Sequence, residues 1–188
     1  MKTERTANDS TRQFEEVMLP HLNAAYSLAR WIVRDSQQAE DLVQEAYLRA
    51  FRYFNRFHGE DARPWLLKIV RNTCYSWLQA NREMSNVMEF RNDENIIDVS
   101  NSNDSFGGNP ESLLLRKARR EEVLAAVEAL PLPFREVIVL REMEEMTYEF
   151  IAEVMNIPVG TVMSRLSRAR ALLRKSLSET DKGFQHED

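Results

Sequence analysis

The sequence is poor in cysteine and in the residues that interrupt regular structure. Its 188 residues include five glycines and six prolines, too few for the many turns of a β-rich fold. Cys74 is the single cysteine, which excludes a disulfide framework and a zinc site built on paired cysteines. The three histidines are scattered and no phosphate-cradling loop is present, so we expect no metal, no cofactor and no catalytic residue.

Long hydrophobic runs are lacking as well. No apolar stretch approaches the roughly 18 residues that a membrane-spanning helix needs. The N-terminal stretch MKTERTANDS is polar, unlike a secretory signal peptide. The hydrophobic content of 43% is that of a globular protein. We therefore expect a soluble, cytoplasmic protein.

Charge is distributed unevenly along the chain. The net charge is −5, with 30 acidic and 25 basic residues. Residues 159–175, VGTVMSRLSRARALLRK, nevertheless carry five basic side chains and no acidic one. Much of the acidity lies in the middle of the chain, in residues 84–110 and again in 136–153. The overall acidity therefore says little about what the two ends of the chain bind.

The first part of the chain predicts three helical runs, the first of which is divided by a proline. Apolar residues recur at helical spacing from Ser10 onward. Pro20 should break this run and open a second helix as its first residue. Asp35 is placed to start the next helix, and Pro64 to open a further one that ends near Arg82.

The middle of the chain looks like a tether. Residues 84–110 show no sustained period and are rich in Asn, Ser, Asp and Gly, which predicts a flexible linker. Helical patterning resumes at Pro110 and is interrupted at Pro131. The sequence thus predicts an all-α protein of two small helical domains, residues 10–83 and 111–178, joined by that linker.

The last part of the chain has the layout of a helix-turn-helix. A short helix capped by Thr147 is followed by the tight connection NIPVG and a longer helix. In the longer helix Val162, Leu166, Ala169 and Leu173 share one face, and the opposite arc holds Thr161, Ser164, Arg165 and Arg168. Arginine can pair with guanine in the major groove while the other side chains hold phosphates. A solvated basic helix face is the alternative; we favour binding of double-stranded DNA.

Three segments in this order resemble a known family. DSQQAEDLVQEAYLRAFRYF and RPWLLKIVRNTCYSWL resemble the second region of bacterial RNA polymerase sigma factors of the extracytoplasmic function (ECF) class. ALPLPFREVIVLREMEEMTYEFIAEVMNIPVGTVMSRLSRARALLRKSL resembles the promoter-binding fourth region. The resemblance covers residues 14–82 and 112–177. It implies an alternative sigma factor that binds core RNA polymerase and directs transcription initiation.

The resemblance assigns polymerase binding to a helix of the second region. In this chain Asp41, Gln44, Glu45 and Leu48 are spaced to lie on one face of that helix. A mixed acidic and apolar stripe suits a basic partner helix. From the residues alone a solvated acidic face remains an alternative, against which Leu48 argues.

The resemblance assigns opening of the start-proximal promoter element to the following helix. Basic residues alternate there with aromatic ones and no acid intervenes, which suits single-stranded DNA. The resemblance places Asn72 at the family's base-reading position. An amide both donates and accepts hydrogen bonds, so it can read a base edge. The loop before the helix matches the specificity loop. The candidates are Phe57, His58, Arg63, Lys68, Arg71, Asn72 and Tyr75; Trp65 and Trp77 are expected in the core.

Three positions of the helix-turn-helix depart from the family pattern. Phe150 stands where an acid usually completes the cap with Thr147. Asn156 replaces a common glycine, and it tolerates left-handed geometry. Met163 stands where a lysine is frequent, so one phosphate contact should be missing. The class resemblance also implies an anti-sigma factor as a partner. Such a partner would hold the chain at the inner membrane.

Two other classes of protein were weighed against a sigma factor. A stand-alone helix-turn-helix regulator explains residues 112–177 but gives AEDLVQE and the aromatic-basic helix no role. An enzyme is disfavoured because no constellation of nucleophile, base or metal ligands is present.

Overall fold

The computed structural model describes residues 2–59, 61–85 and 110–183, with side chains for 10–59, 61–81 and 116–178. Every regular element in these ranges is helical, which confirms the all-α prediction. No helix among them is long and apolar enough to cross a membrane. The helices are α1 (Lys2–Met18), α2 (Leu22–Val33), α3 (Ser36–Tyr53), α4 (Ala62–Ser85), α5 (Pro110–Ala129), α6 (Leu132–Ile138), α7 (Tyr148–Met155) and α8 (Val159–Gly183).

Helix boundaries in the N-terminal half (α1–α4) follow local chemistry, with two corrections. The Asp35 side chain accepts from the Gln38 N–H at 2.7 Å and caps α3. Pro20 breaks the first run, as predicted, but it does not open α2: it lies in a 3₁₀ turn, η1 (Leu19–His21), and α2 starts at Leu22. Proline has no N–H to continue the ladder of α1, and the turn absorbs that loss. Helix α1 also begins at Lys2, well before the expected start at Ser10.

The core of the N-terminal half is built on closely packed α2, α3 and α4. Small side chains at the crossing points allow this approach, because interaxial distance follows side-chain size. Leucines and a valine fill the remaining space between the three helices. The fully buried alanines are Ala25, Ala29, Ala39, Ala46 and Ala50, and the buried larger residues include Leu28, Leu42, Leu66 and Val70.

The C-terminal half (α5–α8) contains the predicted helix-turn-helix. Thr147 caps α7 by accepting from the Phe150 N–H at 3.3 Å. Asn156 ends α7 in the left-handed region with φ 53°, as its side chain allows. Between α6 and α7 lies one π-helical turn, η3 (Val139–Met143). Leu140, Ile151, Val154, Val162 and Leu166 form the core of this half.

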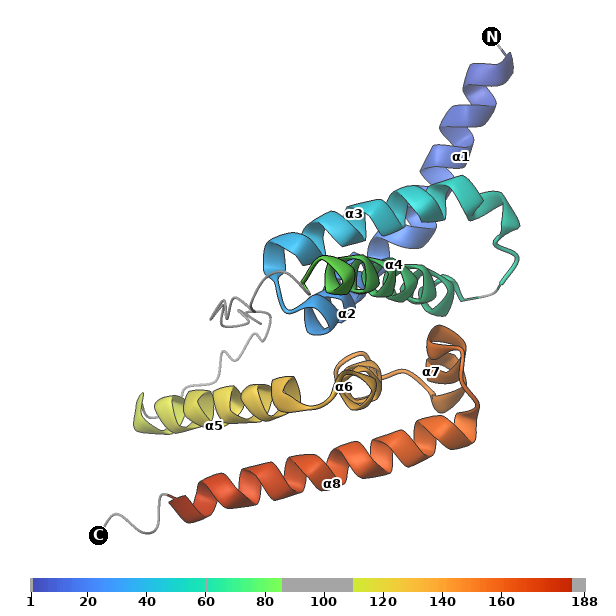
Figure 1. Cartoon of the computed structure of the whole chain (residues 1–188). Coiled ribbons are helices and arrows are strands. Elements are labelled where there is room, and N and C mark those ends of the chain that lie inside the picture. The colour runs from blue at the N-terminus through green and yellow to red at the C-terminus, as the bar shows by residue number, and fades with distance from the viewer. Residues whose placement is uncertain (1, 60, 86–109, 184–188) are drawn as a thin grey trace.

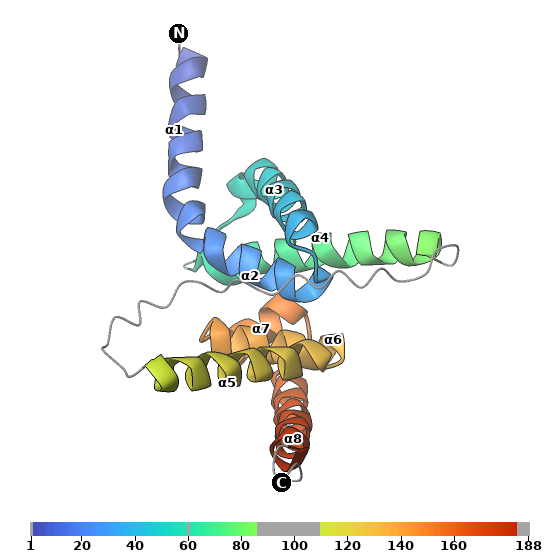
Figure 2. The ribbon, with the colours of Figure 1, turned by 90° about the vertical axis from the view of Figure 1, so that its left-hand side faces the viewer.

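The two halves pack directly on each other. In Figures 1 and 2, α7 lies beneath α4, and α6 lies beneath α2. One continuous cluster of buried apolar residues includes members of both halves. The sequence had predicted two domains without predicting this contact. The proposed linker, residues 84–110, lies outside the described residues except at its ends.

Candidate nucleic-acid interface

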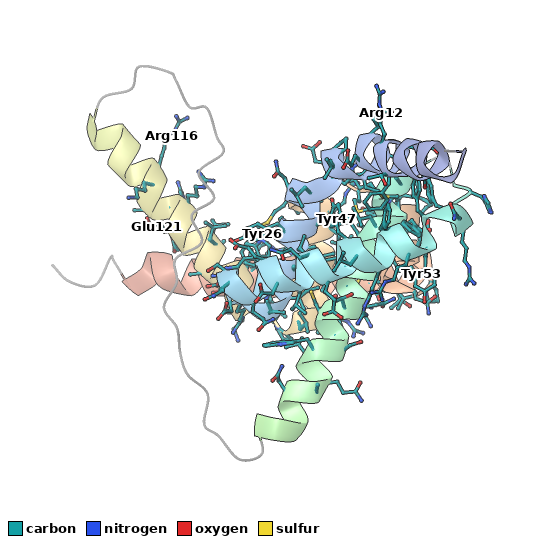
Figure 3. The ribbon with its side chains drawn as sticks, turned by 90° about the horizontal axis from the view of Figure 1, so that it is seen from above. Arg12, Tyr26, Tyr47, Tyr53, Arg116 and Glu121 are labelled. Atoms are coloured by element: carbon teal, nitrogen blue, oxygen red, sulfur yellow. The ribbon has the colours of Figure 1, made fainter. Side chains whose placement is uncertain are left out.

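The outer face of α3 carries the first set of predicted site residues. Asp41, Gln44 and Glu45 are exposed, and Leu48 is 62% exposed. Glu45 pairs with Arg49 one turn further on. Figure 3 views α3 from outside and shows this helix lying across the N-terminal half, with Tyr53 at its end. The helix therefore presents an exposed leucine among carboxylates, as the spacing predicted.

The loop before α4 is held by aromatic packing. The Phe57 ring stacks on Phe54 with centroids 6.3 Å apart and lies 5.3 Å from Trp65. Phe57 and Trp65 are half-buried against the core, and His58 is exposed. A Cβ at Gly59 would come within 3.1 Å of the Phe57 ring. The loop is thus anchored at Phe57, and Trp65 has the core position that the sequence predicted.

Helix α4 holds the basic and aromatic side chains predicted to contact single-stranded DNA. The Arg71 guanidinium lies 4.3 Å from the centroid of the Tyr75 ring, one turn away. Lys68 is half-buried and Asn72 is exposed. Asn72 also lines a groove of about 430 Å³ together with Tyr75, Ser76, Leu78, Gln79 and Leu132. The base-reading candidate is therefore accessible, at the boundary between the halves.

Acidic residues of the C-terminal half reach the basic residues of α4. Glu136 is 1% exposed and accepts from Arg71 Nε at 2.8 Å and from the Tyr75 hydroxyl at 2.7 Å. Glu144 pairs with Arg63 at the start of α4. Burial raises the pKa of the Tyr75 phenol, and the nearby Glu136 charge raises it further. The acid-free helix seen in the sequence is therefore supplied with acids from elsewhere in the chain.

Sequence reasoning missed this role for Glu136, Glu144 and the neighbouring Arg135. Arg135 is 5% exposed and donates to the Trp31 carbonyl at 2.9 Å and to the Leu130 carbonyl at 2.8 Å. Burial, with a contribution from nearby Arg34, lowers the pKa of Arg135 to about 10. A signal was present, because an Arg-Glu pair interrupts the apolar run of FREVIVL. Charges are seldom buried without partners.

The α8 helix presents the second predicted DNA surface. Val162, Leu166 and Ala169 are buried at 0–1% exposure, as predicted. On the opposite arc Ser164 and Arg168 are exposed, while Thr161 and Arg165 are partly exposed. The Ser164 hydroxyl donates to the Thr161 carbonyl at 3.0 Å. The structure thus brings all four residues of the predicted arc to one side of α8.

Contacts within the C-terminal half fix the orientation of α8. Arg170 pairs with Glu142 of η3 at 2.7 Å, and the hydrogen bond raises the pKa of Arg170. Arg141 lies over the Tyr148 ring at 5.0 Å and donates to the Met146 carbonyl at 2.7 Å. Met163 is 51% exposed beside the arc. An acid at position 150 is not needed for the Thr147 cap, which forms with the backbone of Phe150.

Comparisons with known proteins match both halves. Residues 18–83 match the family described as Sigma-70 region 2, and residues 120–173 match Sigma-70, region 4. RNA polymerase sigma-H factor of Pseudomonas aeruginosa is 33% identical over 93% of this chain and 91% of its own length. ECF RNA polymerase sigma-E factor of Escherichia coli K12 is 35% identical over 89% of this chain and 87% of its own.

Solved structures give the same correspondence. The sigma factor RpoE, in complex with the anti-sigma factor NepR from Bartonella quintana, matches with a TM-score of 0.71 and 26% identity, covering 89% of this chain and 98% of that one. CnrH, in complex with the cytosolic domain of CnrY, matches with a TM-score of 0.60 and 23% identity over 90% of each chain. The second match concerns the fold alone.

Proposed function

Because the chain belongs to the ECF class of bacterial RNA polymerase sigma factors, which direct transcription initiation by core RNA polymerase, we propose a role for each of its three surfaces. The exposed face of α3 binds polymerase. The Phe57–Arg63 loop and α4 open and hold the start-proximal promoter element. The outer arc of α8 binds the upstream element as duplex. The chain itself performs no catalytic step in this scheme.

Polymerase binding by α3 is supported by exposure and by chemistry. Leu48 exposes 62% of its surface between Glu45 and the exposed Phe51. An apolar side chain that shares a helix face with Asp41 and Glu45 is complementary to a basic helix with an apolar seam. A leucine that is merely solvated gains nothing from this position, whereas one that docks buries apolar area.

The orientation of α8 is the observation that best supports the proposal, and it supports binding of the upstream element. Three fully buried apolar residues, Val162, Leu166 and Ala169, fix which side of α8 faces its own half. Ser164, Arg165 and Arg168 then project together from the other side. A helix held by its apolar face with polar and basic side chains outward is the geometry that enters the major groove.

Three further assignments belong to this proposal. Residues 10–83 and 111–178 are the two functional domains, and 84–110 joins them. An anti-sigma factor restrains the chain, as the RpoE of Bartonella quintana is held by NepR in its solved complex. The chain works in the cytoplasm, where polymerase and promoters are, and that partner would hold it at the inner membrane.

Asn72→Ala tests the assignment of the α4 surface. We expect transcription from the cognate promoter, found by mapping transcript starts after overexpression, to fall about tenfold or more when a base-reading hydrogen-bond pair is lost. Affinity for core polymerase should not change, because Asn72 does not lie on the α3 face. Asn23→Ala, which removes an exposed asparagine of α2, is the matched control. An equal loss of polymerase affinity in Asn72→Ala would show that Asn72 is structural.

A further inference from the structure

Two adjacent residues of α6 contact two different helices of the N-terminal half. Arg135 points to α2, where it donates to the carbonyl of Trp31 near the C-terminal end of that helix. Glu136 points to α4, where its two carboxylate oxygens accept from Arg71 and Tyr75. Both side chains are almost fully buried. One turn of backbone therefore connects the C-terminal half to two helices of the N-terminal half.

A third contact lies at the other end of the same face. Glu144, just after η3, pairs with Arg63 in the first turn of α4. Glu136 and Glu144 together engage two of the basic side chains that line α4. Arginine binds a carboxylate with the same planar donor fork that it uses for a phosphate. A carboxylate seated on Arg71 or Arg63 thus excludes a phosphate from the same donors.

We propose that Arg135, Glu136 and Glu144 form an autoinhibitory latch, which closes the free chain and covers the promoter-contacting face of α4 with carboxylates in place of DNA phosphates. This inference rests on the function proposed for α4. In the closed arrangement Arg71, Tyr75 and Arg63 are occupied, while Asn72 stays at the edge of the groove. Single-stranded DNA can engage the full set only after the halves separate.

The latch is built to be reversible. Two of its contacts are ion pairs, and those of Arg135 are hydrogen bonds to carbonyls. The Arg135 guanidinium is incompletely satisfied, since its Nε has no hydrogen-bond partner among the described residues. An underbonded buried cation makes the closed arrangement less favourable than apolar packing alone would be. A partner that binds only the separated halves can therefore shift the equilibrium by its differential affinity. Single-stranded promoter DNA, which needs the donors of Arg63 and Arg71, is such a partner under the proposed function.

Neutralising the carboxylates of the latch in the full chain tests the proposal. Glu136→Gln and Glu144→Gln keep the side-chain shapes and remove the charges, and Glu153→Gln removes an exposed carboxylate of α7 as the matched control. Two quantities are measured. Small-angle X-ray scattering gives the radius of gyration, and fluorescence anisotropy gives affinity for a mixed-sequence single-stranded oligonucleotide of about 12 nucleotides, within the usual range of site sizes.

We expect Glu136→Gln to expand the chain and to strengthen oligonucleotide binding about tenfold. The apparent affinity of a site that is open only part of the time is reduced by the open fraction, and loss of a charged hydrogen bond raises that fraction. Glu144→Gln, whose carboxylate is less buried than that of Glu136, should act in the same direction with a smaller effect. Glu153→Gln should leave the radius unchanged and alter affinity less than Glu144→Gln.

The two readouts separate failure of the latch from failure of the proposed function. An unchanged radius and affinity in both latch variants, with helical content retained by circular dichroism, overturns the latch. Expansion without any oligonucleotide binding supports the closed state but overturns the DNA role of α4. A gain in Glu153→Gln equal to that in Glu136→Gln would reduce the effect to net charge, and the latch would again be rejected. Should Glu136→Gln lose helical content, Glu144→Gln alone decides.

Discussion

The two helices assigned to DNA, α4 and α8, differ in what occupies their basic side chains. On α4, Arg63 and Arg71 are paired with Glu144 and Glu136 of the other half. On α8, Arg170 pairs with Glu142 of its own half, while Arg168 on the outer arc is exposed. One helix is thus engaged in contacts between halves and the other presents its arc to solvent. Two surfaces of similar charge therefore need different events before they can bind.

Unfolding one half tests whether the contact makes the chain a single cooperative unit. Leu166→Ala should destabilise the C-terminal half by about 2–5 kcal/mol, since Leu166 is 1% exposed in its core. All three tryptophans, Trp31, Trp65 and Trp77, lie in the N-terminal half, so their fluorescence follows the unfolding of that half. We expect the thermal transition followed by circular dichroism to fall further than the one followed by fluorescence.

The control for this prediction is on the same helix. Leu172→Ala removes a 40% exposed leucine of α8 and should change stability by no more than about 0.5 kcal/mol. Equal shifts of the two transitions in Leu166→Ala would mean that the halves unfold together, and the domain boundaries proposed at residues 83 and 111 would lose their meaning.

Replacing one arginine on each helix sharpens the contrast. Arg71→Met leaves Glu136 buried without its cation, which should lower the free energy of unfolding by up to about 3 kcal/mol. The loss is not larger because the carboxylate can be rehydrated when the halves separate. Arg168→Met removes an exposed side chain and should stay within about 0.5 kcal/mol. Urea unfolding followed by circular dichroism gives both values. Similar small losses would show that the Arg71–Glu136 pair contributes little to stability.

Alkaline pH probes a buried group on α4 that α8 does not have. Burial, and secondarily the charge of Glu136, raise the pKa of the Cys74 thiol from 9.0 to about 12. The folded chain keeps this proton after the unfolded chain has lost it, so stability falls as pH rises above 9. Between pH 8 and pH 10 the fall should be about 1.4 kcal/mol. In urea unfolding, the free energy of unfolding of Cys74→Ala should depend less on pH over this range. An identical pH dependence in the two proteins would argue against the raised pKa of Cys74.

The smallest effect concerns the accessible helix. Met163→Lys places a charge beside the outer arc of α8, where Met163 is 51% exposed. The slope of the logarithm of duplex-DNA affinity against the logarithm of salt concentration should become steeper by about 0.9, the value for one added phosphate contact. The gain should not depend on sequence, because lysine acts as a point charge. Met143→Lys, exposed on η3, should leave the slope unchanged, and so should Met163→Lys if that residue faces away from the DNA.

Local structure was largely predictable because it depends on neighbours in sequence. The caps at Asp35 and Thr147 and the left-handed Asn156 each follow from the chemistry of one side chain. The inward set of α8 follows from helical spacing. Leu22 is one of the apolar residues that recur at helical spacing after Ser10, yet it is 44% exposed. The turn at Pro20 separates α1 from α2 and breaks the shared periodicity.

The contact between the halves could not be predicted in the same way. It joins residues more than sixty positions apart, such as Arg71 and Glu136, and no periodicity links their positions. In the sequence, residues 136–153 form a single acidic segment. Its glutamates serve two different purposes: Glu136 and Glu144 contact α4, and Glu142 orients α8 through Arg170. The roles of individual site residues in binding remain predictions.

The placement of Arg135 and Glu136 side by side has a consequence for how promoter contacts combine. A second ligand that binds more tightly to the separated halves raises the affinity of α4 for single-stranded DNA, and that DNA raises the affinity of the second ligand by the same factor. The two contacts then form cooperatively, without any contact between the ligands. A protein that clasps the two halves together would keep α4 from the promoter without binding α4 itself.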